Sequence, residues 1–169
     1  VAADVGSSGN ILLETLGATT TLTAESNAGI SSGNGNLTLK ANGTVDLQDG
    51  VLVATGGSGT ITLLASTGDL TMDPTAEVNT LNGNQILNAG DDVDDQLVVG
   101  DLKATAANIS LTTTGSVLDA DDASTGEDTD TDITAQNLRI VAGKGIGLLS
   151  GNSLGEPVNA LEIDVDLLA

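Results

Sequence analysis

The stretch Gly35-Asn36-Leu37-Thr38-Leu39-Lys40 recurs along the chain, and the spacing of its copies decides the fold. Each copy has a small or polar pair, an aliphatic residue, a variable residue and a second aliphatic residue. Steps between the first aliphatic positions are 26, 24, 48 and 29 residues, so a period of about 24 recurs with insertions and one doubled step. A repeat of this length is typical of a solenoid in which each repeat forms one coil. These first aliphatic positions are Ile11, Leu37, Ile61, Ile109 and Leu138.

One repeat shows the expected shape of a coil most clearly. Residues 37–41 and 44–47 alternate aliphatic and polar side chains, as short strands do, and residues 51–54 form a third short strand that is entirely apolar. Asn42-Gly43 and Asp49-Gly50 separate them, and a glycine-rich turn follows. Asn-Gly and Asp-Gly also favour hairpins, so an antiparallel meander is the competing interpretation. A meander does not explain the fixed spacing of the motif, whereas a roughly triangular coil with three strands does.

The composition fits a narrow aliphatic interior. The chain of 169 residues has no Phe, Trp, Tyr, Cys or His and a single Met. A compact globule normally fills its centre with aromatic side chains, while stacked coils need only Val, Ile, Leu, Ala and Thr. Disorder is the alternative at high net charge, but 39% of the residues are hydrophobic and they lie in alternating runs.

The charge excludes several classes of partner. Against 24 acidic residues stand four basic ones, which gives a formal net charge of −20. Nucleic-acid binding needs clusters of Lys and Arg, so we expect no nucleic-acid partner. The charge also disfavours attachment to anionic membranes, and no stretch approaches the roughly 18 apolar residues of a membrane span. Lateral association of such chains is unfavourable unless divalent cations bridge them.

Three segments depart from the regular pattern. Residues 78–89 are irregular, and we expect Ile86 and Leu87 to be their core residues. Residues 91–95 read as a loop that interrupts a coil. Residues 119–132 are the most polar stretch of the chain, and we expect them to form an acidic excursion from one corner.

Asparagine precedes the aliphatic residue in several copies of the motif. If these side chains stack, their amides form an internal hydrogen-bonded ladder along the axis. The asparagines concerned are Asn10, Asn36, Asn108 and Asn137.

The domain organisation is expected to be simple. Residues 1–169 read as a single solenoid domain of roughly seven coils. The last strand alternates to its end, and no linker signal separates the end of the sequence from its start. We therefore expect one unit of a longer array, or a subunit that stacks end to end.

The acidic runs are candidate calcium sites. Asp128, Asp130 and Asp132 place carboxylates at alternate positions, as calcium-binding loops do. The segment lacks the glycine and the distal bidentate Glu of an EF-hand, so a solvated loop is the competing interpretation. The sequence thus predicts calcium as the one candidate cofactor. A second candidate group consists of Asp91, Asp92, Asp94 and Asp95.

The repeats resemble those of a known class of proteins. The residues that carry the resemblance are Gly35-Asn36-Leu37-Thr38-Leu39, residues 107–117, and Gly145-Ile146-Gly147 leading to residues 159–165. Their residue pattern is similar to that of the β-solenoid repeats of very large bacterial surface and secreted proteins, the filamentous-haemagglutinin-like adhesins. The resemblance implies a right-handed parallel β-helix, export, and a structural or adhesive role. It carries over no catalytic residue.

The fold class that we expect is therefore an all-β, right-handed parallel β-helix. The predicted function is structural: an extracellular or cell-surface protein, bacterial in origin, that forms or extends a fibre, sheath or stalk by stacking on itself. The alternative is an adhesin segment that binds a host or partner cell surface through the acidic loops. A carbohydrate-active solenoid is a third interpretation. We expect no enzyme, because the usual bases and nucleophiles His and Cys and the aromatic sugar platforms are missing.

Overall fold

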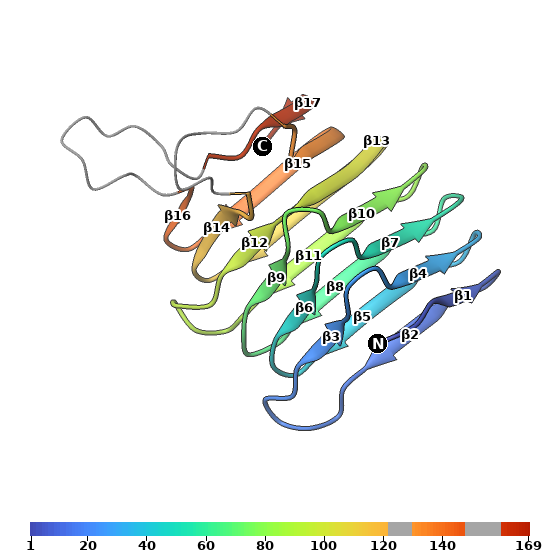
Figure 1. Ribbon diagram of the computed structural model, residues 1–169. Coiled ribbons are helices and arrows are strands. Elements are labelled where there is room, and N and C mark those ends of the chain that lie inside the picture. Colours follow the sequence, from blue (N-terminus) through green and yellow to red (C-terminus); the bar gives the residue numbers. More distant parts are fainter. Residues whose placement is uncertain (122–129, 148–159) are drawn as a thin grey trace.

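The chain is a stack of parallel β-strands (Figure 1). The computed structural model describes residues 1–121, 130–147 and 160–169, and every regular element in these ranges is a strand. All strand pairs among them are parallel, so the expected all-β parallel solenoid is confirmed and the antiparallel meander is wrong. On two sides of the solenoid the ladder partners stack seven successive strand positions, in line with the roughly seven coils expected. In the described ranges no helix is present that could cross a membrane.

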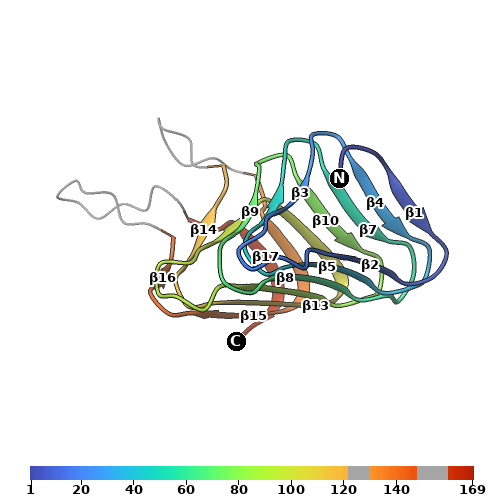
Figure 2. The ribbon, with the colours of Figure 1, turned by 90° about the horizontal axis from the view of Figure 1, so that it is seen from below.

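Each turn contributes strands to three faces, which enclose a narrow interior in the view of Figure 2. Face one contains β1 (Val5–Ser7), β4 (Gly29–Ser32), β7 (Leu52–Thr55) and β10 (Glu77–Thr80). Face two contains β2 (Ile11–Glu14), β5 (Leu37–Ala41), β8 (Ile61–Ala65) and β11 (Gln85–Ala89). Face three contains β3 (Leu22–Ala24), β6 (Val45–Leu47), β9 (Leu70–Met72), β12 (Leu97–Val99), β14 (Ser116–Asp119) and β16 (Gly145–Ile146).

The later strands join face one to face two. β13 (Asp101–Thr113) pairs with β10 through its first part and with β11 through its second part. β15 (Ile133–Ala142) follows β13 with a register shift between Ala104 and Asn108, and β17 (Ile163–Leu168) follows β15. The corner between faces one and two is therefore spanned by continuous strands in this part of the stack.

The step of 48 residues between Ile61 and Ile109 contains one more copy of the motif, which the hydrophobic pattern did not reveal. Gln85 pairs with Ile61 on one side and with Ile109 on the other, so it fills the inward position between them. Gln85 is fully buried, whereas the side chain of Ile86 is 44% exposed. The expectation that Ile86 belongs to the core is wrong, because the polar Gln85 takes the inward position and its neighbour Ile86 therefore points outward. Leu87 is buried as expected.

Hydrogen bonds explain why a glutamine is tolerated inside. Its Nε2 donates to the carbonyl oxygens of Val78 and Lys103, at 2.8 Å each. These carbonyls lie on β10 and β13, just before β13 departs from the regular ladder. The Nε2 group of Gln85 thus adds hydrogen bonds to two strands where the ladder becomes irregular, whereas its Oε1 is buried without a partner among the described residues.

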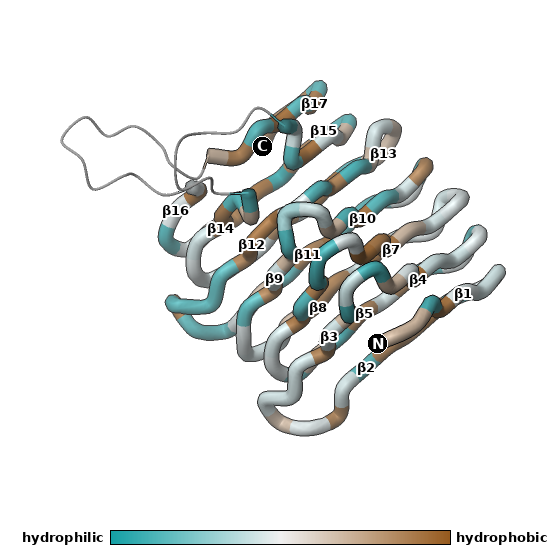
Figure 3. The backbone as a smooth tube through the Cα atoms, in the orientation of Figure 1, coloured by the Kyte–Doolittle hydropathy of each residue, from teal (hydrophilic) through white to brown (hydrophobic). Residues whose placement is uncertain are grey.

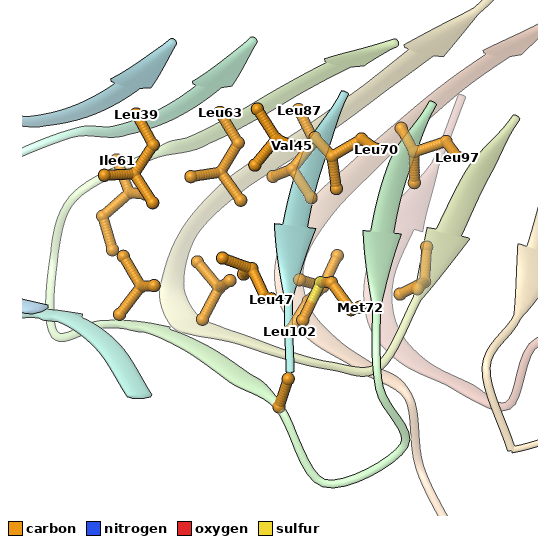
Figure 4. Packing of buried hydrophobic residues seen from close by; sticks show 14 of the residues in the cluster. Leu39, Val45, Leu47, Ile61, Leu63, Leu70, Met72, Leu87, Leu97 and Leu102 are labelled. Atoms are coloured by element: carbon orange, nitrogen blue, oxygen red, sulfur yellow. The ribbon is translucent and has the colours of Figure 1, made fainter. Parts of the chain in front are cut away.

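The interior consists of aligned aliphatic side chains, one layer per turn. Leu39, Leu63 and Leu87 lie in one row and are fully buried (Figure 4). In strands such as β5 and β9 buried apolar residues alternate with less buried polar ones, and hydrophobic and hydrophilic colours alternate along the chain in Figure 3. In β5 Leu37 and Leu39 point inward as expected. Aliphatic layers therefore suffice for the core without any aromatic residue.

Glycines form a second column at the corner between faces one and two. A Cβ built on Gly35, Gly59 or Gly83 would come within 3.0 Å of backbone atoms of the glycine one turn earlier in the chain. Contacts this short do not occur for real side chains, so neighbouring turns approach too closely here for any residue but glycine. The column begins with Gly9, whose built Cβ has only Ser7 Oγ nearby, at 3.9 Å.

The four asparagines are joined in two pairs on the surface and not in one ladder. Asn36 N donates to Asn10 Oδ1 at 2.8 Å, and Asn137 Nδ2 donates to Asn108 Oδ1 at 2.6 Å. Asn10, Asn36 and Asn108 are exposed, so the expectation of an internal ladder is wrong. The asparagines precede the first inward residue of each face-two strand, and that position lies at the corner rather than inside.

Candidate functional site

Three carboxylates meet at the corner between face three and face one, and we call them the acidic corner. Asp119 ends β14, Asp132 directly precedes β15, and Glu162 directly precedes β17. Backbone hydrogen bonds stack the turns here: Leu102 N donates to Asp132 O at 2.7 Å, and Ile133 N donates to Glu162 O at 3.1 Å. Asp119 and Asp132 thus lie at the two ends of one corner, and Glu162 lies at the same corner one turn further along.

The acidic corner is compact and largely shielded from water. Each of its three residues offers a carboxylate oxygen, and these oxygens lie within 4.8 Å of one another. Asp119 is 5% exposed, Asp132 is 7% exposed, and Glu162 is half-buried. Backbone N–H groups orient two of the side chains: Glu162 N donates to Asp132 Oδ2 at 2.7 Å, and Asp121 N donates to Asp119 Oδ1 at 2.8 Å.

Asp119 interrupts an otherwise apolar column. On face three it pairs with Val99, and Val99 follows the inward positions of Met72, Leu47 and Ala24 on the earlier strands. An aspartate in this position carries a carboxylate into the aliphatic interior. Such a group needs a proton, a cation or strong hydrogen bonds to be tolerated there.

A cavity of about 80 Å³ lies beside the acidic corner. One oxygen of Asp101 binds Lys103, which also lies 3.6 Å from Glu77 Oε2. The other oxygen, Oδ1, is buried and has no hydrogen-bond partner among the described residues. The walls of this cavity therefore carry more negative charge than the nearby lysine can compensate. They are formed by Pro74, Gly100, Asp101, Asp119, Asp121, Asp130, Thr131 and Asp132.

The environment makes Asp132 an unusually weak acid. Burial raises the pKa of its carboxyl group to about 8, and the negative charges of Asp119 and Glu162 act in the same direction. The hydrogen bond from the backbone of Glu162 opposes this rise. At neutral pH the acidic corner therefore retains a proton on Asp132 in the absence of a cation.

The same donor set suits a hard divalent cation. Calcium takes six to eight oxygen ligands, and carboxylates are the side chains it prefers. Asp119, Asp132 and Glu162 could supply three of these oxygens, and Asp101 and Asp130 line the adjoining cavity. A bound cation would take the place of the Asp132 proton and neutralise the mutual repulsion of the carboxylates.

The structure distributes the first group of predicted calcium ligands as follows. Asp132 belongs to the acidic corner, Asp130 lines its cavity, and Asp128 lies outside the described residues. Sequence reasoning did not pair Asp132 with Asp119 and Glu162. It placed Asp119 in the excursion of residues 119–132, whereas Asp119 is the last residue of β14.

The second predicted group is not brought together. Oδ2 of Asp95 accepts hydrogen bonds from the backbone of Asp91 and Asp92, at 3.0 and 2.9 Å. Asp94 forms an ion pair with Lys144, and the hydrogen bond and charge of this lysine lower the pKa of Asp94. Among the described residues, the acidic corner is the group whose carboxylates are close enough to share a metal ion. The loop at residues 91–95 instead uses its carboxylates to close a turn and to bind a lysine.

Comparison with known proteins adds no relative. No family model matches the chain, and neither a curated protein nor a solved structure matches it.

The raised pKa of Asp132 predicts a pH-dependent stability. Between about pH 4 and about pH 8 the folded protein keeps a proton on Asp132 that the unfolded chain releases, so stability is lost as pH rises through this range. Asp132→Asn stays neutral, and we expect it to gain about 1–2 kcal/mol over wild type at pH 8 and almost nothing at pH 4. Urea unfolding with a chelator present measures the difference. Asp164→Asn, at an exposed position of β17, is the control; equal pH slopes in all three proteins would contradict the prediction.

Proposed function

We propose that this chain is a structural element of an extracellular fibre, sheath or stalk on a bacterial surface, extended by end-to-end stacking of the solenoid. The observation that carries the proposal is the state of the two terminal strands. Within the described residues β1 pairs with β4 alone and β17 pairs with β15 alone, so each presents an unpaired edge. Unpaired edges of this kind are templates for another strand.

The side chains at the C-terminal end support stacking. Ile163, Leu167 and Leu168 of β17 are 39%, 59% and 56% exposed. Ile163 and Leu168 pair with Ile133 and Leu138, which are buried, so they extend inward columns that nothing in the described structure covers. A further coil would bury them, and the same mode applies whether it comes from a second copy or from more residues of one chain.

Assembly of the purified chain tests the proposal. We expect sedimentation velocity and electron microscopy to show particles that lengthen along one axis as concentration rises. Leu168→Glu should reduce this assembly because it places a charge on the stacking surface. Leu81→Glu is the matched control, since Leu81 is 59% exposed in a corner in the middle of the stack. A chain that stays monomeric at every concentration would overturn the proposal and favour the adhesin segment.

Calcium is proposed as the stabilising cofactor at the acidic corner. If the site binds, calcium at about 100 times its Kd should raise the free energy of unfolding by about 2.7 kcal/mol. Asp119→Asn should lose most of this increment, because the substitution removes one carboxylate ligand while the protein still folds. Asp94→Asn, in the loop whose carboxylates are already used, should keep it. Identical unfolding curves with calcium and with a chelator would remove calcium from the proposal.

A further inference from the structure

The contacts between successive turns follow two aliphatic columns. On face one and on face two, ladder partners place one inward residue of each turn above that of the turn before. The same interface is thus repeated along the whole stack, with Gln85 as its one polar member. The face-one column is Val5, Ile30, Val53, Val78, Leu102, Ile133 and Ile163. The face-two column is Ile11, Leu37, Ile61, Gln85, Ile109, Leu138 and Leu168.

The first and last members of each column are chemically alike. Val5 and Ile163 end the face-one column, and Ile11 and Leu168 end the face-two column. Each pair would make an aliphatic contact of the kind that the column already repeats. An open recess of about 450 Å³ lies beside the first turn and is lined in part by Val1.

The backbone of the two edges is also complementary. In a parallel ladder alternate residues of a strand bond to opposite neighbours. Gly33 N donates to Ser7 O at 2.8 Å, so Ser7 faces β4 and its neighbour Gly6 directs its N–H and C=O to the open edge. At the other end Ile133 N donates to Glu162 O at 3.1 Å, so Glu162 faces β15 and Ile163 directs its N–H and C=O away.

We infer that two copies of this chain join head to tail in one register, with Ile163 of one copy opposite Val5 of the next and Leu168 opposite Ile11. This inference rests on the proposed stacking function and specifies its geometry. In this register Gly6 N–H donates to Ile163 C=O, and Val165 N–H donates to Gly6 C=O. A shift by one residue would place the inward side chains of β17 against outward positions of β1.

The corner between the faces selects this register over shifts of two residues. Residues 8–10 form the corner of the first turn, and residues 166–167 form that of β17. The corner of the first turn is one residue longer than the corner of β17. Within the chain, the corner at residues 33–36 is likewise one residue longer than the corner of the first turn, on which it stacks. The chain already stacks turns with this difference. A shift of two residues would place the corner of one copy against a strand of the other.

Charge makes the junction sensitive to salt. In the inferred register Glu162 lies opposite Asp4, whose Oδ1 accepts a hydrogen bond from Gly29 N at 2.8 Å. Two like charges at the contact, added to the net charge of −20, repel the copies at low ionic strength. Association should therefore strengthen as sodium chloride shortens the screening length from about 30 Å at 0.01 M to about 8 Å at 0.15 M.

Cysteine pairs test the register directly, because the chain contains no cysteine of its own. Asp164→Cys and Gly6→Cys are placed on separate copies, mixed and oxidised. In-register residues of adjacent strands lie about 4.8 Å apart, within the range that a disulfide spans. A Cβ at Gly6 meets only Ser31 Oγ, at 3.7 Å, so the substitution fits the fold. The matched control combines Asp164→Cys with Asp4→Cys, which is off by two residues.

The inferred register predicts about tenfold more cross-linked dimer from the first pair than from the control. Leu167→Cys with Asn10→Cys, both at exposed positions, gives a second in-register pair if a first variant folds poorly. Equal yields, or a higher yield from the control, in a sample that still forms axial particles would overturn the register and leave the stacking function intact. A chain that remains monomeric at every salt concentration would overturn both.

Discussion

Replacing Gly59 with alanine is expected to lower the free energy of unfolding by about 2–4 kcal/mol. The new Cβ would lie within 3.0 Å of the carbonyl group of Gly35, in the preceding turn. Neither turn can yield easily, because both are bound into the ladder through their flanking strands. Thermal or urea unfolding, followed by circular dichroism in the strand region, measures the loss.

Gly9→Ala is the control for this substitution, because Gly9 begins the same column. A Cβ there finds its nearest neighbour at 3.9 Å, which is an ordinary contact. We expect Gly9→Ala to change the free energy of unfolding by less than about 0.5 kcal/mol. An equal loss at Gly9 and Gly59 would mean that glycine acts through the unfolded chain and not through the close approach of the turns.

Gln85→Ala is expected to cost about 3–5 kcal/mol in the free energy of unfolding. The substitution leaves a cavity at a fully buried position and removes the Nε2 donor from the carbonyls of Val78 and Lys103. Both losses act on the folded state alone. Equilibrium unfolding in urea gives the difference from wild type.

Two further variants separate the causes of that loss. Gln85→Leu restores most of the volume but removes the two hydrogen bonds of Nε2, so about 0.5–1.5 kcal/mol should remain lost. Ile86→Ala removes an exposed neighbour and should cost less than about 0.5 kcal/mol. If Gln85→Leu were as stable as wild type, the hydrogen bonds of Gln85 would have no net stabilising role.

Much of the fold could be predicted from the sequence because the motif reports directly on side-chain direction. In β5 the alternation of Leu37, Thr38 and Leu39 predicts which side chains point inward, and the period predicts which strands lie side by side. Both properties are local or depend on counting residues. Position 85 was missed because hydrophobicity identifies inward residues only where they are apolar. The two acceptors that make Gln85 favourable lie on neighbouring strands.

The acidic corner could be predicted only in part. An acidic run between residues 119 and 132 is visible in the sequence, but the proximity of Asp119 to Glu162 depends on which turn ends above which. One signal was available: Asp119 follows an aliphatic pair at the end of a short strand, where earlier turns have an apolar residue. Sequence reasoning assigned Asp119 to a loop, because carboxylates are rarely buried.

The glycine column has a mechanical consequence. At this corner the main chains of successive turns rest directly on one another, with no side-chain layer between them. At the corner between faces two and three, a Cβ built on Gly43, Gly115 or Gly143 would also come within 3.0 Å of the backbone of the preceding turn. We therefore expect compression along the axis to be resisted by the main chain at both corners, since there is no compressible side-chain layer between the turns.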